Sequence, residues 1–370
     1  MLDTFAVPRV GAERTIVEPV WPERLVRPTD TKLIYLDTNQ WIALAKAATG
    51  HPDGERFVAA LQTLRANRNG WTYVIGMSLI MELTGIMRPR QRQDLAEVIE
   101  EFTNYACVVP LNAIAALELE AVLVREGATN LQFDPVPLLG RGVLRACGFD
   151  GNLRVRDRAG NDITARVRQE APDGPEAFDR RLVEAARIFD RTVVRGPADD
   201  NEAAALRAKG WNPATTRQVA ENRAEQERTL ASALAADESR RRGRLRDEIA
   251  IQYLSLEIAD TVQRVVYARG IRLPNVLTDV ETARRFTDAM PSADVWLTLR
   301  TAKHRSASST WKANDIFDID ALSVTAPYCD VVVAERHSTH VLRQAGVPSR
   351  YSTTLLTNLH ELSEHVSATA

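Results

Sequence analysis

The sequence predicts an α/β fold in which the first and last thirds of the chain build one parallel sheet. Short β-branched and aromatic runs alternate with segments of helical spacing in both thirds, as expected for strands joined by crossover helices. Between them lies a long Ala-, Glu- and Arg-rich stretch with helical character only. A chain of 370 residues with 45% hydrophobic content can bury a sizeable core.

The first third alternates strands and helices along the chain. Residues 32–36 predict a strand, and two helical segments follow, one after Asp37 and one over 57–64. The next elements are a strand over 71–75, a helix capped by Ser78 that carries Glu82, a helix over 91–103, a strand over 106–109 and a helix over 112–125. Strands separated by helices favour a parallel sheet.

The middle of the chain is predicted to be a mostly helical insertion. Residues 130–173 hold prolines and several glycines, with a hairpin around 153–155 and 163–165. Helical spacing returns over 178–193, and 214–267 is nearly free of glycine and proline. The second half of that stretch has a broad apolar face, so we expect it to dock on the rest of the protein.

In the last third the alternation resumes, with a helix over 315–326, a strand over 331–334, a helix over 337–344, a strand over 354–356 and a terminal helix. We therefore expect an N-terminal arm over 1–31, a sheet domain in two halves over 32–130 and 296–370, and the insertion over 131–295.

The composition says more about the cellular compartment of the protein than about its activity. The three cysteines, Cys107, Cys147 and Cys329, have no C-x-x-C spacing, so neither a disulfide framework nor a zinc knuckle is indicated. The first 31 residues lack the apolar core of a signal peptide, and no later apolar run is long enough to cross a bilayer. We expect a cytoplasmic protein without a membrane segment. A formal net charge of −2 neither favours nor excludes a nucleic-acid partner.

Four acidic residues stand where an open parallel sheet binds its ligands, outside the carboxyl ends of the strands. Asp37 ends the first strand, Glu335 follows the late strand, Asp318 lies at the start of the preceding helix, and Glu82 can join them from its own helix. Such carboxylates repel one another unless protons or cations neutralise them. Oxygen ligands without His or Cys suit Mg²⁺ or Mn²⁺ and argue against zinc.

Neighbouring acids are ranked by their place on the helix. Asp315 lies one turn before Asp318 and shares its face, so it is a further candidate ligand. Asp320 is about 200° away from Asp318 at ~100° per residue and ranks lower.

These residues, in this order, resemble the PIN-like nuclease domains. The resemblance covers about 32–125 and 296–370 and leaves the insertion unexplained. It is carried by Leu36-Asp37-Thr38-Asn39, by Glu82 in its helix, by Asn314-Asp315 with Asp318, and by the run 327–335. It implies a three-layer, Rossmannoid parallel sheet, Mg²⁺ or Mn²⁺ in an acidic pocket, and hydrolysis of RNA or single-stranded nucleic acid that leaves a 5′-phosphate.

Carried over residue by residue, the resemblance makes Asp37 and Asp318 metal ligands and lets Glu82 bind directly or through water. Asn39 would hold the first-strand loop by hydrogen bonding. Glu335 stands where the family usually has an aspartate, and Ala334 replaces the expected hydroxyl residue, so the second metal subsite departs from the pattern. Asn39, Asp320 and Asp330 are secondary candidates.

Each of these acids also has an ordinary structural explanation. Asp37 can cap the following helix, the acids at 315, 318 and 320 can complement a helix dipole, and Glu82 can be a solvated helix residue. Two other functions stay open for the same residues. One is a decayed PIN-like module that binds RNA or a protein, and the other is a metal phosphohydrolase acting on small esters in a closed pocket.

Basic residues near the acids are candidates for nucleic-acid contact. Lys303, His304 and Arg305 precede the acidic helix, while Arg241 and Arg244 belong to the Arg-rich run 240–246. Such cations can neutralise backbone phosphates. They can equally be solvated or paired with acids such as Asp237 and Asp247. Pairing of the long helices between two chains would give a homodimer through the insertion.

Overall fold

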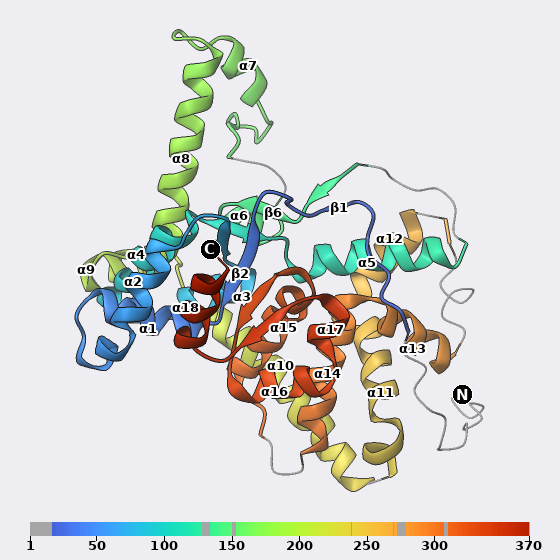
Figure 1. The fold of residues 1–370 in the computed structure, drawn as a ribbon. Helices are drawn as coiled ribbons and strands as arrows, with labels where there is room; N and C mark the ends of the chain where they lie inside the picture. Colours follow the sequence, from blue (N-terminus) through green and yellow to red (C-terminus); the bar gives the residue numbers. More distant parts are fainter. Residues whose placement is uncertain are drawn as a thin grey trace.

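The centre of the molecule is a four-stranded parallel sheet in the order β3-β2-β7-β8 (Figure 1). The structure is a computed structural model that describes residues 17–127, 134–149, 153–237, 239–268, 270–271, 279–306 and 310–369. The strands are β2 (Lys32–Leu36), β3 (Trp71–Val74), β7 (Val331–Val333) and β8 (Thr354–Leu356). The predicted α/β fold, with a parallel sheet shared by the first and last thirds, is confirmed.

Strand β2 is the point at which the strand order reverses. Its sequence neighbour β3 pairs on one side, and β7, nearly three hundred residues later, pairs on the other, with Leu36 opposite Val333. Beyond β3, Ile75 makes a parallel bridge to Cys107 in β4 (Ala106–Val108), which also pairs antiparallel with β6 (Leu139–Arg141). A separate parallel pair joins β1 (Leu25–Val26) to β5 (Val136–Pro137).

Helices pack on both faces of the sheet because alternate strand residues point to opposite sides. Leu33 and Tyr35 of β2 belong to one buried cluster, whereas Ile34 and Leu36 belong to another. The second cluster is completed mainly by α1 (Thr38–Ala48), α2 (Val58–Ala66), α3 (Met77–Thr84), α4 (Pro89–Thr103) and α18 (Leu359–Ala368). The first includes α5 (Leu111–Arg125), α14 (Pro291–Arg305), α15 (Ala313–Tyr328), α16 (Arg336–Gln344) and α17 (Val347–Tyr351).

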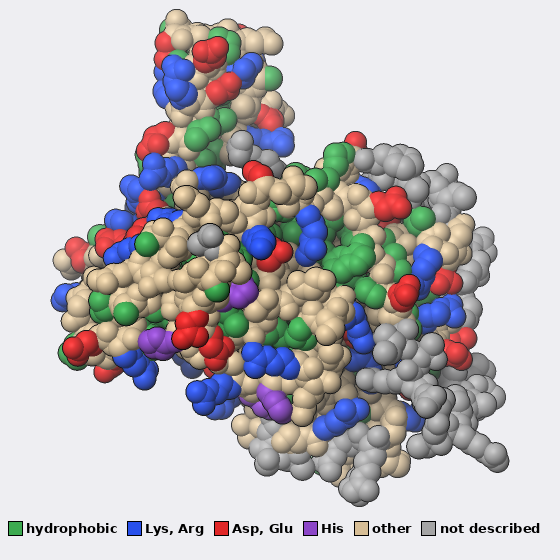
Figure 2. Space-filling model, in the orientation of Figure 1, with side chains coloured by type: hydrophobic (Ala, Val, Ile, Leu, Met, Phe, Trp, Pro, Cys, Tyr) green, Lys and Arg blue, Asp and Glu red, His purple; other side chains and the backbone are tan. Residues whose placement is uncertain are grey.

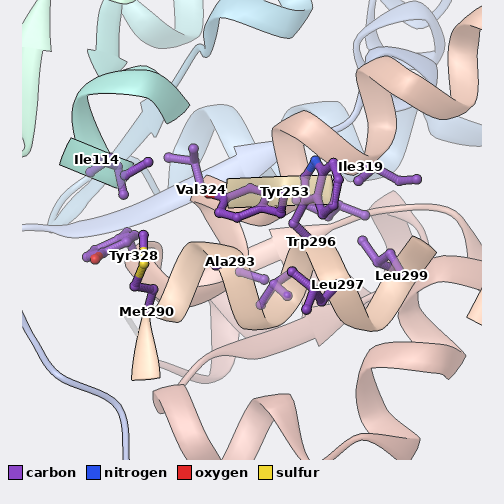
Figure 3. Packing of buried hydrophobic residues seen from close by; sticks show 14 of the residues in the cluster. Ile114, Tyr253, Met290, Ala293, Trp296, Leu297, Leu299, Ile319, Val324 and Tyr328 are labelled. Atoms are coloured by element: carbon purple, nitrogen blue, oxygen red, sulfur yellow. The ribbon is translucent and has the colours of Figure 1, made fainter. Parts of the chain in front are cut away.

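The insertion helices share this first cluster. They are α10 (Ala214–Ala236), α11 (Leu245–Gln252), α12 (Ala259–Ala268) and α13 (Val280–Ala289). Tyr253 packs on Trp296 with ring centroids 4.8 Å apart, close to Ile319 and Val324 of α15 (Figure 3). The predicted docking of the apolar face is therefore confirmed for Leu245, Ile249, Tyr253, Ile258 and Val262, whereas Leu256, on the same stretch, is exposed. The stretch is not one continuous helix, because Asp237 is extended directly after α10, and π-helical turns follow at Arg240–Arg244 and Tyr253–Glu257.

Helix α8 (Pro175–Arg195) projects from the body as an arm that carries α7 (Thr164–Gln169) at its far end (Figure 1). The hairpin predicted here is wrong in its second strand. Arg156 and Asp162 form a single antiparallel bridge, and α7 begins at Thr164 because Asp162 accepts a hydrogen bond from the Thr164 amide, 3.0 Å away. The remaining short helices are α6 (Val143–Ala146) and α9 (Asp200–Ala208).

Two further predictions about helices need correction. Ser78 does not cap α3, because the chain turns immediately after Ile75 and Gly76 takes the N-cap position. Helix α14 was not predicted from the sequence, although it supplies much of the core between α15 and the insertion. Across the described ranges, no helix combines the length and the apolar character needed to cross a membrane.

Candidate functional site

The carboxyl ends of β2 and β7 lie side by side and place Asp37 and Glu335 at the same edge of the sheet. The Asp37 amide donates a hydrogen bond to the Val333 carbonyl, 3.0 Å away. Asp37 precedes α1 and Glu335 precedes α16, yet neither side chain accepts a capping hydrogen bond from the helix that follows. Helix capping therefore does not account for Glu335, whereas the first amides of α1, those of Thr38 and Asn39, lie close enough to Asp37 to lower its pKa.

Asp318 faces the same edge from α15. Together with Asp37 and Glu335 it lines a narrow hollow, whose other walls are Tyr35, Ala321, Leu322, Ala334 and Ser338. Asp37 is buried, with 7% of its surface exposed, Asp318 is half-buried and Glu335 is exposed. The structure thus brings together side chains that are almost three hundred positions apart in the sequence.

The two residues after Asp37 form hydrogen bonds with two of the other acids, Glu82 and Glu335. The hydroxyl of Thr38 donates to the carboxylate of Glu82 on α3. The side-chain amide of Asn39 donates to Glu335 over 3.1 Å. Asn39 was predicted to fix the loop, whereas the role of Thr38 was not anticipated. Thr38 lies in the same four-residue motif, but its partner is set by how α1 packs near α3.

Burial and mutual repulsion raise the pKa values of three of these carboxyl groups. Burial raises the pKa of Asp318 to about 9, and the charges of Asp37, Glu82 and Glu335 add to the rise. The pKa of Glu82 rises to about 7 for the same reasons, against the Thr38 hydrogen bond that lowers it. The pKa of Asp37 rises to about 6 through burial and then Glu335, while the amides of Asn39 and Thr38 oppose the shift.

These four carboxylates lack cationic partners. Within the part of the chain that the structure describes, none of Asp37, Glu82, Asp318 and Glu335 forms an ion pair with Lys, Arg or His. Buried negative charge without a counter-ion is costly, and protons or metal ions can relieve it. The site is therefore an unneutralised acidic cluster at the reversal point of a parallel sheet.

The other acids that the sequence suggested have structural partners. Asp315 accepts a hydrogen bond from the Lys312 amide at 2.6 Å and pairs with Lys303 at 2.8 Å, so it caps α15 as the alternative explanation expects. Asp320 pairs with Arg223 of the insertion. Asp330 begins β7 at the end opposite Glu335, where it accepts a hydrogen bond from the Leu33 amide at 2.7 Å.

The basic residues expected to meet phosphate are only partly at the surface. His304 is buried, and its Nε2 lies 2.8 Å from Glu227; burial and the nearby Arg300 and Lys303 lower its pKa to about 3. A phosphate in solvent cannot reach it, so this expectation is corrected. Lys303 is largely covered by its pairing with Asp315, while Arg305 is exposed.

The Arg-rich run contributes little that can be placed at the hollow. Arg244 is half-buried in the π-helical turn after α10, and the side chain of Arg241 lies outside the described residues. Helix α16 instead presents Arg336, His337, His340 and Arg343 to solvent directly after Glu335. Figure 2 shows Lys, Arg and His side chains gathered over this helix. The sequence signal was the strongly amphipathic pattern of 336–344.

The donor chemistry fits a hard divalent cation, but the side chains are not arranged around one. Among the described residues, no group of three or more Asp, Glu, His or Cys side chains could hold a metal ion in its present arrangement. The hydrogen bonds from Thr38 and Asn39 hold Glu82 and Glu335 in this arrangement. Carboxylate oxygens alone are the ligand set that Mg²⁺ and Mn²⁺ prefer.

No family model matches the chain, and no match was found among curated proteins or solved structures. A functional conclusion must therefore come from the residues of the site.

Proposed function

We propose that this protein is a metal-dependent endoribonuclease that hydrolyses RNA or single-stranded nucleic acid. Asp37, Glu82, Asp318 and Glu335 would hold Mg²⁺ or Mn²⁺. The proposal depends on one observation. Asp37, Asp318 and Glu335 meet around a hollow at the reversal point of the sheet, and no cation among the described residues pairs with them. Stable proteins rarely keep such charges together unless an ion or a reaction requires them.

A divalent cation in this site would activate a water molecule and stabilise the leaving oxygen of a phosphodiester. The residues of the chain would hold and orient that ion. Thr38 and Asn39 position the carboxylates of Glu82 and Glu335. Tyr35 and Leu322 form two of the walls of the hollow. A lower local dielectric strengthens every charge interaction in the hollow.

The surface beside the hollow supports a phosphate-bearing substrate. An acidic cluster repels a nucleic acid, so binding needs cations next to it. Arg336 and His337 follow Glu335 directly, and Arg305 ends the helix that precedes α15. The arrangement of β4, β3, β2, β7 and β8, with helices packed on both sides, supports the resemblance to a three-layer PIN-like fold.

The first test is cleavage of a single-stranded RNA of about 20 nucleotides by purified protein. We expect cleavage with Mn²⁺ or Mg²⁺, products that carry a 5′-phosphate, and no cleavage in EDTA. Asp37→Asn should be inactive because the substitution removes ligand charge without changing size. Asp330→Asn is the matched control, since it changes an acid at the other end of β7 and should keep wild-type activity.

The same assay separates the competing functions. Faster hydrolysis of a mononucleotide ester than of the oligonucleotide would indicate a small-substrate phosphohydrolase. Failure to cut RNA, together with a melting temperature that Mn²⁺ leaves unchanged, would indicate a non-catalytic binding module.

A further inference from the structure

Helix α10 of the insertion lies across the two helices that carry Glu82 and Asp318. It packs against both α3 and α15, and these two helices also pack against each other. The hydroxyl oxygens of Thr216 on α10 and Thr84 on α3 are 3.4 Å apart. One insertion helix therefore bridges the two elements whose separation sets the distance between the two acids.

The apolar contact beneath α10 involves the sequence neighbours of both acids. Ala220 of α10 packs in a small buried cluster with Ala313 and Phe317 of α15, and Met81 of α3 packs against it. Met81 precedes Glu82, and Phe317 precedes Asp318. A shift of α10 would therefore be passed directly to the backbone that carries the two carboxylates.

Arg223 fixes α10 on the opposite side of α15 from the hollow. Its guanidinium donates to both carboxylate oxygens of Asp320, at 2.5 and 3.1 Å, and to Glu257 at 3.1 Å. Because Asp318 and Asp320 are about 200° apart on one helix, holding Asp320 fixes the direction in which Asp318 points. A bidentate pair adds geometric specificity to the contact.

A second set of charges, one turn further along α10, fixes the position of the helix along α14. Glu227 forms an ion pair with Arg300 and a hydrogen bond with His304, and all three side chains are almost fully buried. Buried charges that lose their partners are strongly destabilising, so α10 can dock only where both sets of pairs form.

We propose that α10 clamps α3 and α15 together and so sets the separation of the Glu82 and Asp318 carboxylates, with Arg223 as the positioning residue. The catalytic meaning of this clamp rests on the function proposed above. The clamp itself makes a prediction about distance that does not depend on activity.

The test compares Arg223→Met with Arg168→Met. Arg168 makes an exposed bidentate pair with Asp179 in the projecting arm, so its loss controls for removing an arginine pair. Spin labels at Met77→Cys and Asn314→Cys, both exposed, report the distance between α3 and α15 in a Cys147→Ser background. We expect a narrow distance distribution in the parent and in Arg168→Met, and a broadened or shifted one in Arg223→Met.

The second readout is the dissociation constant for Mn²⁺, measured from the resonance signal of the free ion. Loss of a positioning contact should weaken Mn²⁺ binding about 10-fold or more, and Arg223→Lys should recover part of the loss. A folded Arg223→Met protein with the parent distance distribution would overturn the proposal. If Arg223→Met fails to fold, the Arg223→Met/Asp320→Leu double variant removes both charges and is expected to show the same broadening.

The two readouts separate this proposal from the proposed function. If the parent protein binds no Mn²⁺, the metal-dependent function is wrong, and the label distances still decide whether α10 positions the helices. If the parent binds Mn²⁺ and the distances do not respond to Arg223, the clamp is wrong and the metal site stands.

Discussion

The two sides of helix α15 carry aspartates in opposite electrostatic surroundings. Asp320 faces the insertion and is neutralised by the guanidinium of Arg223. Asp318, two residues earlier, faces the hollow, where burial and the charges of Asp37, Glu82 and Glu335 raise its pKa to about 9. Asp320 thus pairs with an arginine of α10, whereas Asp318 has no cationic partner among the described residues.

The difference distinguishes charge used for assembly from charge kept for chemistry. The charges around Asp320 belong to a set that joins α10, α14 and α15 and is satisfied by the protein itself. The acids around Asp318 accept hydrogen bonds from Thr38 and Asn39 but have no cationic partner among the described residues. Substitutions on the two sides of α15 should therefore have opposite effects on stability.

The largest expected effect is the loss of cleavage in Asp318→Asn. Removing one charge from the metal site should reduce kcat for RNA cleavage by about a hundredfold to a thousandfold. The variant should keep the circular dichroism spectrum of the parent. Its melting temperature without metal should be equal or higher, because residue 318 no longer has to take up a proton on folding. Cleavage at the parent rate would remove Asp318 from the proposed site.

Asp320→Asn should lower the stability of the protein, unlike Asp318→Asn. The substitution leaves the guanidinium of Arg223 with only Glu257 and is expected to lower the free energy of unfolding by about 2 kcal/mol, which is less than for a fully buried pair because both side chains are partly exposed. Urea unfolding measures this loss. If Asp320→Asn is as stable as the parent, the pair with Arg223 is not what holds α10 on α15.

Some of these positions can be predicted from local sequence patterns, and others cannot. The strands over 32–36 and 331–333, and hence the positions of Asp37 and Glu335, follow from local pattern and from the rule that ligands bind at strand ends. His304 was misplaced because α14 was not foreseen and the partner Glu227 lies 77 residues away. The pairing of Arg223 with Asp320 likewise depends on how α10 docks, which no local pattern specifies.

The errors in the arm have the same origin. Residues 163–165 have strand-like composition, yet Asp162 and Thr164 form a local hydrogen bond that starts a helix instead. Side chains that bond to nearby backbone compete with the sheet ladder, and periodicity alone does not record that competition.

The acidic side should also make stability depend on pH when metal is absent. Folding raises the pKa values of Asp37, Glu82 and Asp318 to about 6, 7 and 9, so the folded state binds more protons than the unfolded state above pH 4. Stability contributed by these groups is therefore lost as pH rises from about 4 towards 9. Between pH 5 and 8, the free energy of unfolding of the parent should fall by at least about 1.4 kcal/mol more than that of Asp318→Asn. This difference corresponds to a shift of one pKa unit.

Chemical denaturation of both proteins at pH 5, 6, 7 and 8 in EDTA measures this difference. Saturating Mn²⁺ should cancel it in the parent, because the ion stabilises the charged carboxylates. If the free energies of unfolding of the two proteins change in parallel with pH without metal, Asp318 has the same pKa in the folded and unfolded states.

The smallest effect is expected on RNA affinity at the basic surface of α16. Arg336→Gln in an Asp37→Asn background, which prevents cleavage, should weaken binding of single-stranded RNA by a few-fold and lower the salt slope of log K by about 0.7. Fluorescence anisotropy at several salt concentrations measures both quantities. Arg168→Gln in the arm is the control and should change neither, so an equal loss in both variants would argue against a local contact at α16.

The most direct test of the metal site is an anomalous difference map from a crystal of the protein soaked in Mn²⁺. We predict a manganese peak in the hollow between the carboxylates of Asp37, Asp318 and Glu335, with those side chains turned towards it. A map that shows well-occupied manganese at other sites in the crystal, and no peak in this hollow, would contradict the proposed metal site.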